Sequence, residues 1–326
     1  MSVSKIEHQL TTCKINRKAF LRGAALAALS PFLPRVPRAD AAAIGVIEIA
    51  PGIFVHQGKF ADVNPENGGD ISNLSFVVGK DAVAVIDTGG SALIGKTVRE
   101  AVAAVTRTPI RYVINTHMHP DHVLGNAGFA MDSPEYVAHH KMARGLAQRA
   151  EGYLSRNKGW MGDAQFEGTK IVMPTKAVVD LLECDLGGRV LRLQARPTAH
   201  TDNDLTVYDT VTDTLILGDI AFAGRIPTLD GSIIGWLKVI KTLKAETPAR
   251  VVPGHGPPSM SITNALLPVE RYLTVVATDV RAAIKAGKTI SEATETAGLS
   301  EKDAWLLFDE HHKRNVTAAF AELEWE

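Results

Sequence analysis

The sequence predicts an α/β fold in which two β-sheets pack against each other and helices cover their outer faces. Short runs rich in β-branched residues form two blocks, around residues 45–140 and 185–256, and helical stretches separate some of these runs. Turn-like residues join many of the runs as hairpins, which argues against a single doubly wound parallel sheet. Because no Pro/Gly/Ser-rich linker divides residues 42–326, we expect them to form one domain.

The first block should contain five strands and one helix. The helix is expected over residues 91–106, where apolar residues recur at helical spacing and Ser91 is a suitable N-cap. One strand, "IRYVINTH", is expected to be buried and leads into a histidine cluster. The expected strands lie within residues 52–58, 73–79, 82–89, 110–117 and 135–140.

The second block should contain four strands, and a helical region lies on each side of it. Residues 141–175 carry little strand signal and are expected to form a helical insertion. From about residue 266 to residue 325 the pattern is mostly helical and predicts a C-terminal helical extension. The expected strands lie within residues 189–195, 204–210, 213–219 and 249–256.

The charge of the chain is nearly balanced. Its 35 basic and 36 acidic residues give a net charge of −1, and no basic face dominates, so nucleic acid is not an expected partner. No apolar run reaches the roughly 18 residues that span a bilayer. Of the two cysteines, Cys13 lies in the N-terminal leader, so Cys184 would be alone in the mature chain. We expect Cys184 to be a small core residue.

The first 41 residues have the layout of an export signal peptide. A basic start is followed by a short apolar stretch over residues 19–33 and by small residues. "NRKAFL" resembles the twin-arginine signal, with Arg17 and Lys18 in the place of the arginine pair. Cleavage is expected after "ADA" at residues 39–41. The alternative is an N-terminal tail or anchor; export, by the twin-arginine route, is the interpretation that the pattern favours.

A metal-binding cluster is predicted by "THMHPDH", which places three histidines and one aspartate within seven positions. Imidazole and carboxylate groups bind zinc, and iron or manganese can use them as well. His117 and His119 are two residues apart after a strand, so in an extended segment their side chains point the same way and can hold one ion. Pro120 should impose a turn or an extended segment, after which Asp121 and His122 could face a second ion.

Three further candidate ligands lie at the ends of predicted strands. His200 in "TAHTDNDLTVYD" comes just ahead of a strand, Asp219 in "LILGDIAF" comes just after one, and His255 in "VVPGHGPP" follows another. Each of them alone could be an ordinary loop or turn residue. Because all three occupy the same kind of position as the histidine cluster, together they predict one shared metal site.

The motifs "HMHPDH", "AHTDND", "LGD" and "PGHG", in this order, resemble those of the metallo-β-lactamase superfamily. The resemblance implies a four-layer αββα sandwich with two metal ions, expected to be zinc, at one edge. It implies that Asp219 bridges the two ions and that Asp87, in "VIDTG", supports the metal-binding loop without touching a metal. The remaining ligands divide into His117, His119 and His200 for the first ion, and Asp121, His122 and His255 for the second.

This ligand set implies a hydrolytic enzyme. Two metal ions about 3.5–4 Å apart can hold a shared hydroxide and lower its pKa towards 7. The hydroxide would attack a carbonyl or phosphorus centre without a side-chain nucleophile, and Asp121 is the catalytic residue expected to orient it or pass on its proton. β-Lactamases of this fold usually carry Cys or Ser where this chain has Asp219. The aspartate resembles that of glyoxalase II-like thioesterases, lactonases and phosphodiesterases.

The flanking stretches narrow the resemblance. "VHQGKFADVNPENGGDISNLSFVVG", "RIPTLDGSIIGW" and "NVTAAFAELEWE" resemble the SoxH-like hydrolases, also called quinoprotein relay system zinc metallohydrolases, over residues 46–326. This implies a periplasmic enzyme with a small-molecule substrate and a functional link to a quinoprotein dehydrogenase or to sulfur oxidation. Two alternatives stay open: a mononuclear iron oxygenase acting on a persulfide, and a non-catalytic accessory protein of a periplasmic dehydrogenase.

Further expectations concern the surroundings of the site. Loop 56–70 could cover the metal ions, and Arg225 could meet an anionic substrate group or form a surface ion pair. Residues 141–160 could form a lid or pack their own apolar face, and the apolar stretch 305–308 should dock the C-terminal extension. Four histidines are expected to be ordinary surface or core residues: His139, His140, His311 and His312.

Overall fold

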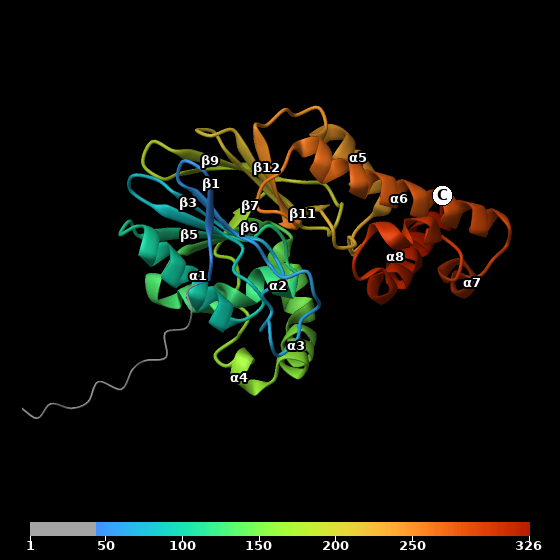
Figure 1. The fold of residues 1–326 in the computed structure, drawn as a ribbon, viewed down its shortest axis with the longest axis horizontal. Helices are drawn as coiled ribbons and strands as arrows, with labels where there is room; N and C mark the ends of the chain where they lie inside the picture. Colours follow the sequence, from blue (N-terminus) through green and yellow to red (C-terminus); the bar gives the residue numbers. More distant parts are fainter. Residues whose placement is uncertain (1–43) are drawn as a thin grey trace, which may run out of the picture. The chain divides into compact units, whose positions relative to one another are not determined.

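The computed structural model describes residues 44–326, so the expected export signal lies outside the described residues. Within this range two β-sheets pack face to face, and helices cover both outer faces (Figure 1). None of the described helices combines the length and the apolar character that crossing a bilayer requires. The layering is helix, sheet, sheet, helix, which confirms the αββα sandwich that the sequence predicts.

Both sheets mix antiparallel and parallel pairing. The strands of the first sheet are β1 Ile47–Ala50, β2 Ile53–His56, β3 Leu74–Val78, β4 Val83–Ile86, β5 Ile110–Ile114, β6 Glu135–His139 and β7 Lys176–Val178. Those of the second are β8 Leu181–Asp185, β9 Val190–Ala195, β10 Leu205–Asp209, β11 Thr214–Phe222 and β12 Arg250–His255. The first sheet has the order β1-β2-β3-β4-β5-β6-β7 and the second β12-β11-β10-β9-β8. Pairing is parallel from β4 to β7 and between β11 and β12, and antiparallel elsewhere.

The helices occur in three parts of the chain. The first is beside the first sheet, with α1 Ala92–Val105, α2 Pro120–Val123 and the 3-10 helix η1 Leu124–Asp132. The predicted insertion contains α3 Met142–Met161 and α4 Asp163–Phe166. The last consists of α5 Ile233–Leu243, α6 Ile262–Lys285, α7 Ile290–Thr294, the 3-10 helix η2 Leu299–Ala304 and α8 Phe308–Leu323. Ser91 caps α1, as expected, because its side chain accepts a hydrogen bond from the backbone N–H of Ile94.

Three apolar layers hold the sandwich together. Between the sheets, Ile53 and Ile114 of the first sheet share a fully buried cluster with Leu193 of the second. Outside the first sheet Val98 of α1 is buried, and outside the second sheet Trp236 of α5 is buried. Burying a side chain of this size stabilises the fold by about 1.5–3 kcal/mol. The sheets are therefore fixed rigidly against each other, which positions the loops at their edges.

The strands that the sequence did not predict lie at sheet edges or are short. β1 is an edge strand whose Ile47 is 54% exposed, and β7 has three residues. β8 is the outer strand of the second sheet, and only its Cys184 is fully buried, in the role expected of it. Helix α5 was not predicted either, because a short apolar run does not distinguish a strand from a helix.

The C-terminal extension docks through only part of the predicted apolar stretch. Trp305 and Phe308 are buried in the same cluster as α5 and α6. Leu306 is 54% exposed, so its expected docking role is wrong. Its backbone instead pairs with the segment after β11, where the Leu306 N–H donates to Gly224 O and its carbonyl accepts from Ile226 N–H. Residues 305 and 306 lie in an extended segment, in which successive side chains point in opposite directions. Trp305 therefore points into the core and Leu306 points outward.

Candidate metal centre

The seven predicted ligands come together at one edge of the sandwich. His117, His119 and His122 lie in the segment that follows β5 of the first sheet. His200 lies in the segment that precedes β10 of the second sheet. Both segments lie at this edge. Asp219 lies within β11, and His255 ends the parallel neighbour β12. Because the two sheets are packed face to face, segments that are far apart in the sequence deliver their side chains to the same place.

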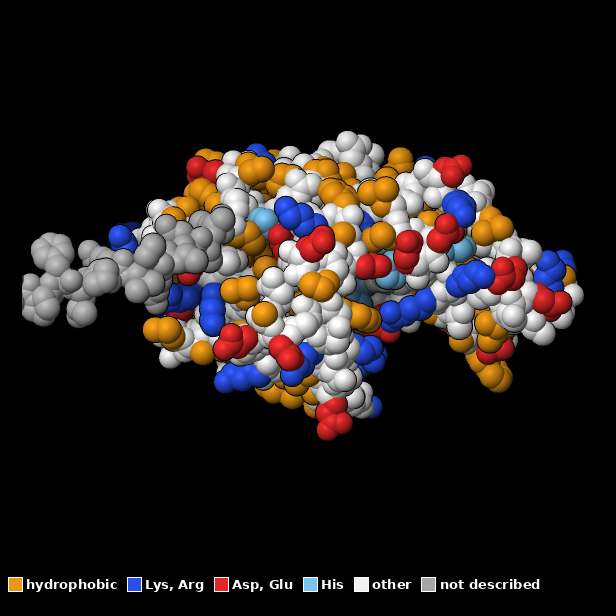
Figure 2. Space-filling model, turned by 60° about the horizontal axis from the view of Figure 1, so that its bottom comes forward, with side chains coloured by type: hydrophobic (Ala, Val, Ile, Leu, Met, Phe, Trp, Pro, Cys, Tyr) orange, Lys and Arg blue, Asp and Glu red, His pale blue; other side chains and the backbone are white. Residues whose placement is uncertain are grey.

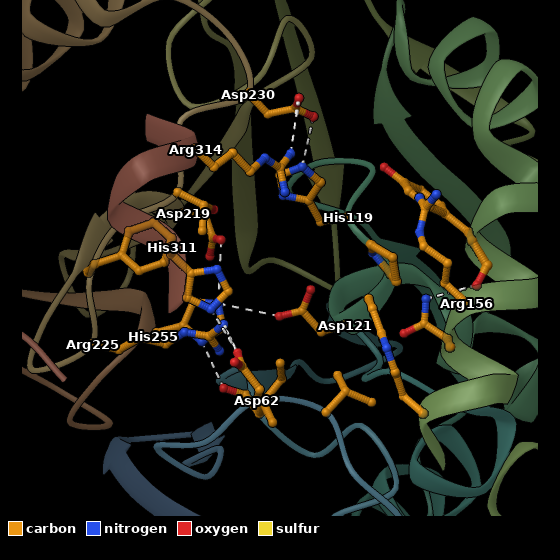
Figure 3. Close-up of a pocket in the computed structure, with 18 of the residues that line it drawn as sticks. Asp62, His119, Asp121, Arg156, Asp219, Arg225, Asp230, His255, His311 and Arg314 are labelled. Atoms are coloured by element: carbon orange, nitrogen blue, oxygen red, sulfur yellow. Dashed lines mark hydrogen bonds and ion pairs between the residues drawn. The ribbon is translucent and has the colours of Figure 1, made fainter. Parts of the chain in front are cut away.

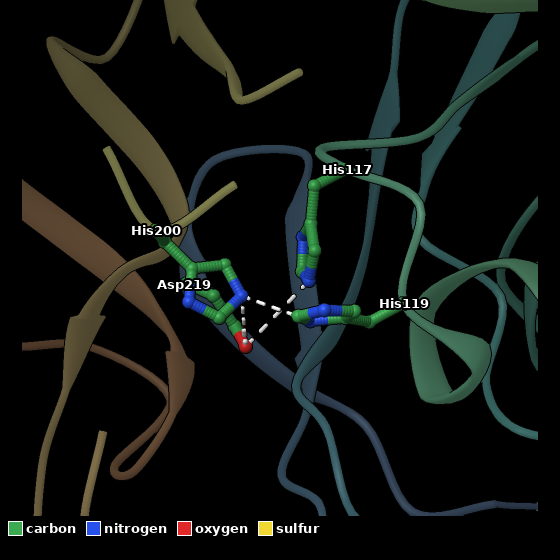
Figure 4. Close-up of side chains that lie close together, drawn as sticks. All are labelled: His117, His119, His200 and Asp219. Carbon is green, nitrogen blue, oxygen red and sulfur yellow. Dashed lines mark hydrogen bonds and ion pairs between the residues drawn. The ribbon is translucent and has the colours of Figure 1, made fainter. Parts of the chain in front are cut away.

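Two groups of potential metal-binding atoms lie at this edge. The first group is shown in Figure 4, and within each group all the candidate donor atoms lie within 4.8 Å of one another. The members are His117, His119, His200 and Asp219 in the first group, and Asp121, His122 and His255 in the second. The resemblance implied the same grouping of the six other residues, with Asp219 between the two ions. The structure therefore has the side chains for two adjacent ions.

Asp219 contacts both groups. Its Oδ2 atom lies 3.4 Å from Nε2 of His200 and 3.6 Å from Nε2 of His117, both in the first group. In the second group, its Oδ1 atom lies 3.2 Å from Nε2 of His122 and its Oδ2 atom lies 3.4 Å from Nε2 of His255. A carboxylate that contacts both groups is placed where it could bridge two ions.

Each histidine of the two groups has one ring nitrogen held by a partner outside the groups. A fixed outer nitrogen sets the ring orientation and the tautomer, and so presents the other nitrogen to a metal. The pairs are His117 Nδ1 with Thr116 Oγ1 at 3.1 Å, His119 Nε2 with Asp230 at 3.1 Å, His122 Nδ1 with Asp87 at 2.8 Å, His200 Nδ1 with Thr228 O at 2.7 Å, and His255 Nδ1 with Ile71 O at 2.7 Å.

Several of the inward-facing atoms have no hydrogen-bond partner within residues 44–326, whereas Nε2 of His200 and Nδ1 of His119 lie 2.9 Å from each other. Among the described residues, Nε2 of His117, Nε2 of His122 and Oδ1 of Asp219 are buried and make no hydrogen bond. A backbone carbonyl accepts from Nδ1 of His255, which leaves Nε2 to face Oδ2 of Asp121 at 3.3 Å and Oδ2 of Asp219 at 3.4 Å. A cation between these atoms would contact all three. The donor set therefore fits metal ions.

Asp87 supports the cluster without belonging to either group. Its carboxylate accepts hydrogen bonds from the backbone N–H of Thr116 at 2.8 Å, from the Thr116 hydroxyl at 2.7 Å and from Nδ1 of His122 at 2.8 Å. Its backbone has a positive φ of 59°, which is uncommon outside glycine. The strained backbone turns the side chain under the segment that follows β5, where its carboxylate contacts both Thr116 and His122.

Burial and the surrounding charges shift the pKa values of the cluster in opposite directions. Burial lowers the pKa of His200 to about 3 and holds that of His117 well below its usual value, so both rings are neutral. Burial also disfavours the charged form of His122, but the carboxylates around it, Asp219 first, outweigh burial and raise its pKa. Burial opposes ionisation of Asp121, yet His122 and other neighbours lower its pKa well below its usual value. Metals bind neutral imidazoles and ionised carboxylates, so an ion at His122 would have to displace the proton that the surrounding carboxylates favour.

Two expectations about single residues need correction. Pro120 does not start a turn or an extended segment: it is the first residue of the helical turn α2, a position that suits proline because its missing N–H needs no partner there. Arg225 is 6% exposed and is therefore not part of a surface ion pair. Its guanidinium lies 3.1 Å from the carboxylate of Asp62, in the loop over residues 56–70.

Two residues that the sequence analysis did not select also belong to the site. Asp230, eleven residues after Asp219, holds His119, and its pKa is lowered to about 2 because His119 and nearby arginines outweigh the effect of burial. His311 lies beside the site with Nε2 2.8 Å from Asp62. Asp230 lies in "RIPTLDGSIIGW", which was quoted only for its resemblance, and His311 was expected to be an ordinary surface or core residue. Both come from segments that only the fold brings near the site. His312 has the core role expected of it and bonds to Tyr272 and Ala297 O.

A cavity of about 470 Å³ opens onto the cluster, large enough for a small-molecule substrate. Members of the ligand cluster line its floor, and further lining comes from the loop over residues 56–70, helix α3 of the insertion, the segment after β11 and helix α8. Figure 3 shows Asp121 inside this cavity, with Arg156 on the α3 side and Arg225 and His311 on the other. In Figure 2, histidine side chains are visible among basic and acidic side chains on this face of the molecule.

The fold and the cluster define a class of protein, that of αββα sandwiches with a histidine- and aspartate-rich metal site at one edge. The family model described as "Metallo-beta-lactamase superfamily" matches residues 67–255, which is more than half of the 326-residue chain. The chain therefore belongs to the metallo-β-lactamase superfamily. This superfamily supports a metal-dependent, hydrolase-like function for the cluster.

Solved structures agree with this assignment at the level of the fold. The chain is similar to a metallo-β-lactamase from Pontibacter korlensis, with a TM-score of 0.57 and 18% identity over 71% of this chain and 98% of that one. It is also similar to the protein TMB-1, with a TM-score of 0.55 and 19% identity over 71% of this chain and 96% of that one. Since both are almost fully covered, the part of this chain outside the matches is additional to their fold.

A similar curated protein is the 2,4-dinitroanisole O-demethylase subunit alpha of Nocardioides sp. (strain JS1661). The two are 24% identical over 183 residues, which is 55% of this chain. The chain spans about half the length of this relative, 51% of which is matched.

Proposed function

We propose that the protein is a dinuclear metal-dependent hydrolase of esters, thioesters or related bonds, with zinc as the metal. The observation that carries this proposal is the position of Asp219, whose two oxygens face the two groups of candidate ligands at 3.2 to 3.6 Å. A single ion would use only one of the groups, and Asp121, His122 and His255 would then have no reason to present their donor atoms inward.

In this proposal the candidate ligands bind the ions and Asp121 also accepts a proton. His117, His119 and His200 hold one ion, while Asp121, His122 and His255 hold the other, and Asp219 bridges them. When bound, two such ions lower the pKa of a water molecule and polarise the bond to be cleaved. Asp121 lines the cavity and is ionised, so it can accept a hydrogen bond from the attacking water and take up its proton. No serine or cysteine nucleophile is needed.

The setting is part of the proposal. The leader over residues 1–41 supports export to the periplasm by the twin-arginine route. The stretches flanking the motifs resemble SoxH-like hydrolases, so we extend the proposal to a role beside a quinoprotein dehydrogenase or in sulfur oxidation. Metal analysis distinguishes one alternative from this proposal, and a host phenotype distinguishes the other. One iron per chain with oxygen consumption would favour a persulfide oxygenase, and a host phenotype that survives loss of hydrolysis would favour an accessory role.

The decisive experiment is a hydrolysis screen with matched variants. Wild type, Asp121→Ala and the control Asp303→Ala, which changes an exposed aspartate far along the sequence in η2, are assayed on thioesters, lactones, β-lactams and phosphodiesters. An aryl methyl ether is added because the curated relative is named as a 2,4-dinitroanisole O-demethylase subunit. Two zinc ions per chain, with hydrolysis lost only in Asp121→Ala, is the expected result. Wild-type-like hydrolysis by Asp121→Ala would refute the proposed catalytic role.

A further inference from the structure

One face of helix α3 forms a wall of the cavity. The residues that line it recur about once per helical turn, at positions 149, 153, 156–157 and 160, which places them on a single side of an α-helix. They are Arg149, Tyr153, Arg156, Asn157 and Trp160. The wall thus combines two guanidinium groups with two aromatic rings, and it is part of the insertion that follows the first sheet.

The four carboxylates that line the cavity all have nearby cationic or imidazole partners. Asp121 and Asp219 lie within 3.2 to 3.6 Å of the cluster histidines. Asp62 lies 3.1 Å from Arg225 and 2.8 Å from His311. Bound metal ions would add further positive charge beside the first two. No carboxylate is left over to neutralise another cation in the cavity.

Asp230 is paired in the same way, but its arginine partners are held loosely. Its carboxylate lies 3.1 Å from Nε2 of His119 and only 3.7 Å from Arg149 and 3.5 Å from Arg314. Distances above about 3.2 Å are long for a hydrogen bond from nitrogen. The guanidinium groups of Arg149 and Arg314 therefore keep donors that a ligand can use.

Two groups of the α3 wall have no protein partner among residues 44–326. Arg156 forms no ion pair or hydrogen bond there, although Figure 3 shows it at the cavity. Tyr153 is 5% exposed and lines the cavity, yet its hydroxyl group makes no hydrogen bond to a described residue. Burial raises the pKa of Tyr153, so the hydroxyl stays protonated and can donate. The hydroxyl oxygen is not among the buried atoms that lack a partner, so it is open to the cavity and can donate to a ligand there.

We propose that the α3 wall binds an oxyanion of the substrate, with Arg156 and Tyr153 as its specificity-determining donors and Arg149 in support. This rests on the proposed hydrolase function and names its substrate class: a compound with an acidic group at one end and the scissile bond at the other. A carboxylate or a phosphonate-like group matches the planar fork of a guanidinium. Apolar side chains of the cavity, Val63 and Phe222, would contact the part of the substrate between the two ends.

The test measures binding by calorimetry to the metal-loaded protein rather than turnover. The probes are dicarboxylates from succinate to suberate, each compared with the monocarboxylate of the same carbon number. One carboxylate of either probe can bind at the metal ions, so only the second one reports on the α3 wall. Wild type should bind at least one dicarboxylate about tenfold or more tighter than its monocarboxylate, which is the size of a charge-assisted hydrogen bond.

Variants of the α3 wall test whether its side chains cause the tighter binding of dicarboxylates. Arg156→Gln should reduce the ratio to less than about threefold, Arg156→Lys should retain part of it, and Tyr153→Phe should lower it by a smaller factor because a neutral donor is lost. Arg144→Gln is the matched control, since Arg144 is an exposed arginine of the same helix that does not line the cavity. A ratio that is unchanged in Arg156→Gln would overturn the proposal, as would equal binding of every pair by wild type.

The binding test separates this inference from the proposed hydrolase function. If the protein hydrolyses none of the screened bonds but keeps the Arg156-dependent preference, the hydrolase proposal fails and the anion wall stands. If it hydrolyses a neutral ester and an ester with a terminal carboxylate equally well and binds every probe pair equally, the wall fails and the hydrolase proposal stands. Replacing the distal carboxylate of adipate by a phosphonate, in 5-phosphonopentanoate, tells which oxyanion the wall prefers.

Discussion

Asp87 accepts a hydrogen bond from Nδ1 of His122 at 2.8 Å, and both side chains are almost completely buried. The same carboxylate accepts from the backbone N–H and the hydroxyl of Thr116, so all of its neighbours are donors. One side chain thus holds both the segment that carries His117 and the ring of His122. The orientation of the two ligand groups depends on this contact.

Asp87→Asn should therefore weaken metal binding without unfolding the protein. In asparagine, an NH2 group replaces one of the two carboxylate oxygens. This NH2 group must then face the N–H of His122 or a donor group of Thr116, so one hydrogen bond is lost. Loss of such a supporting contact typically lowers metal affinity about 10- to 100-fold. Competition with a chromogenic chelator measures the affinity, and circular dichroism checks the fold. The exposed control Asp303→Asn should bind metal as wild type does, and unchanged affinity in Asp87→Asn would argue against the supporting role.

The Asp230 contact with His119 predicts a graded effect. Asp230→Ala removes the acceptor from Nε2 of His119, whose other nitrogen lies 2.9 Å from Nε2 of His200. Metal affinity should fall by about tenfold or more. Asp230→Asn keeps a carbonyl oxygen that can accept and should lose less. The same chelator competition distinguishes the two, and equal affinities for Asp230→Ala and wild type would contradict this assignment.

Metal removal should destabilise the folded protein. Without cations, Nε2 of His117, Nε2 of His122 and Oδ1 of Asp219 are buried and make no hydrogen bond to a described residue. A metal present at about a hundred times its dissociation constant contributes about 2.7 kcal/mol to the free energy of unfolding. Denaturant unfolding at fixed pH, before and after dialysis against a chelator, measures the loss, and added zinc should restore it. Coincident unfolding curves with and without metal would show that the cluster binds none.

His139 predicts a pH dependence that is separate from the metal centre. The side chain is 3% exposed, its Nδ1 accepts from the N–H of Lys141 at 3.1 Å, and it stacks on His140. Burial first, and then His140 and Lys141, lower the pKa of His139 to about 4 from an unfolded value of 6.5. Between pH 4 and pH 6.5, His139 is mostly protonated in the unfolded chain and mostly neutral in the folded protein, so the unfolded chain binds one proton more. Stability is therefore present above pH 6.5 and is lost as the pH falls towards 4.

This lost stability should amount to about 2 kcal/mol between pH 7 and pH 5. His139→Asn keeps an acceptor for the Lys141 N–H but removes the titrating ring. Urea unfolding of wild type and variant at both pH values isolates the contribution of His139, because all other groups are shared. The gap in stability between the two proteins should shrink, or reverse, at the lower pH. A gap that does not depend on pH would show that His139 titrates normally.

Much of the fold could be predicted because its core strands are continuously buried. β3, β4 and β5 are apolar runs between turn residues, and α1 has a helical apolar face with a serine cap. Their patterns depend only on local burial, so they are visible in the sequence. Edge strands such as β1 and β8 bury only one side and have one hydrogen-bonded neighbour, which leaves a weak pattern.

The sequence by itself determined the chemistry of the metal centre. The seven candidate ligands are types that bind metals, and they follow or precede buried strands, so their convergence could be expected. Only the tertiary structure decided what surrounds them. Asp230, His311 and Arg156 come from a loop and two helices whose approach to the cavity depends on how the insertion and the C-terminal extension pack. Packing of this kind sums many weak, non-local contacts, and no local motif records its outcome.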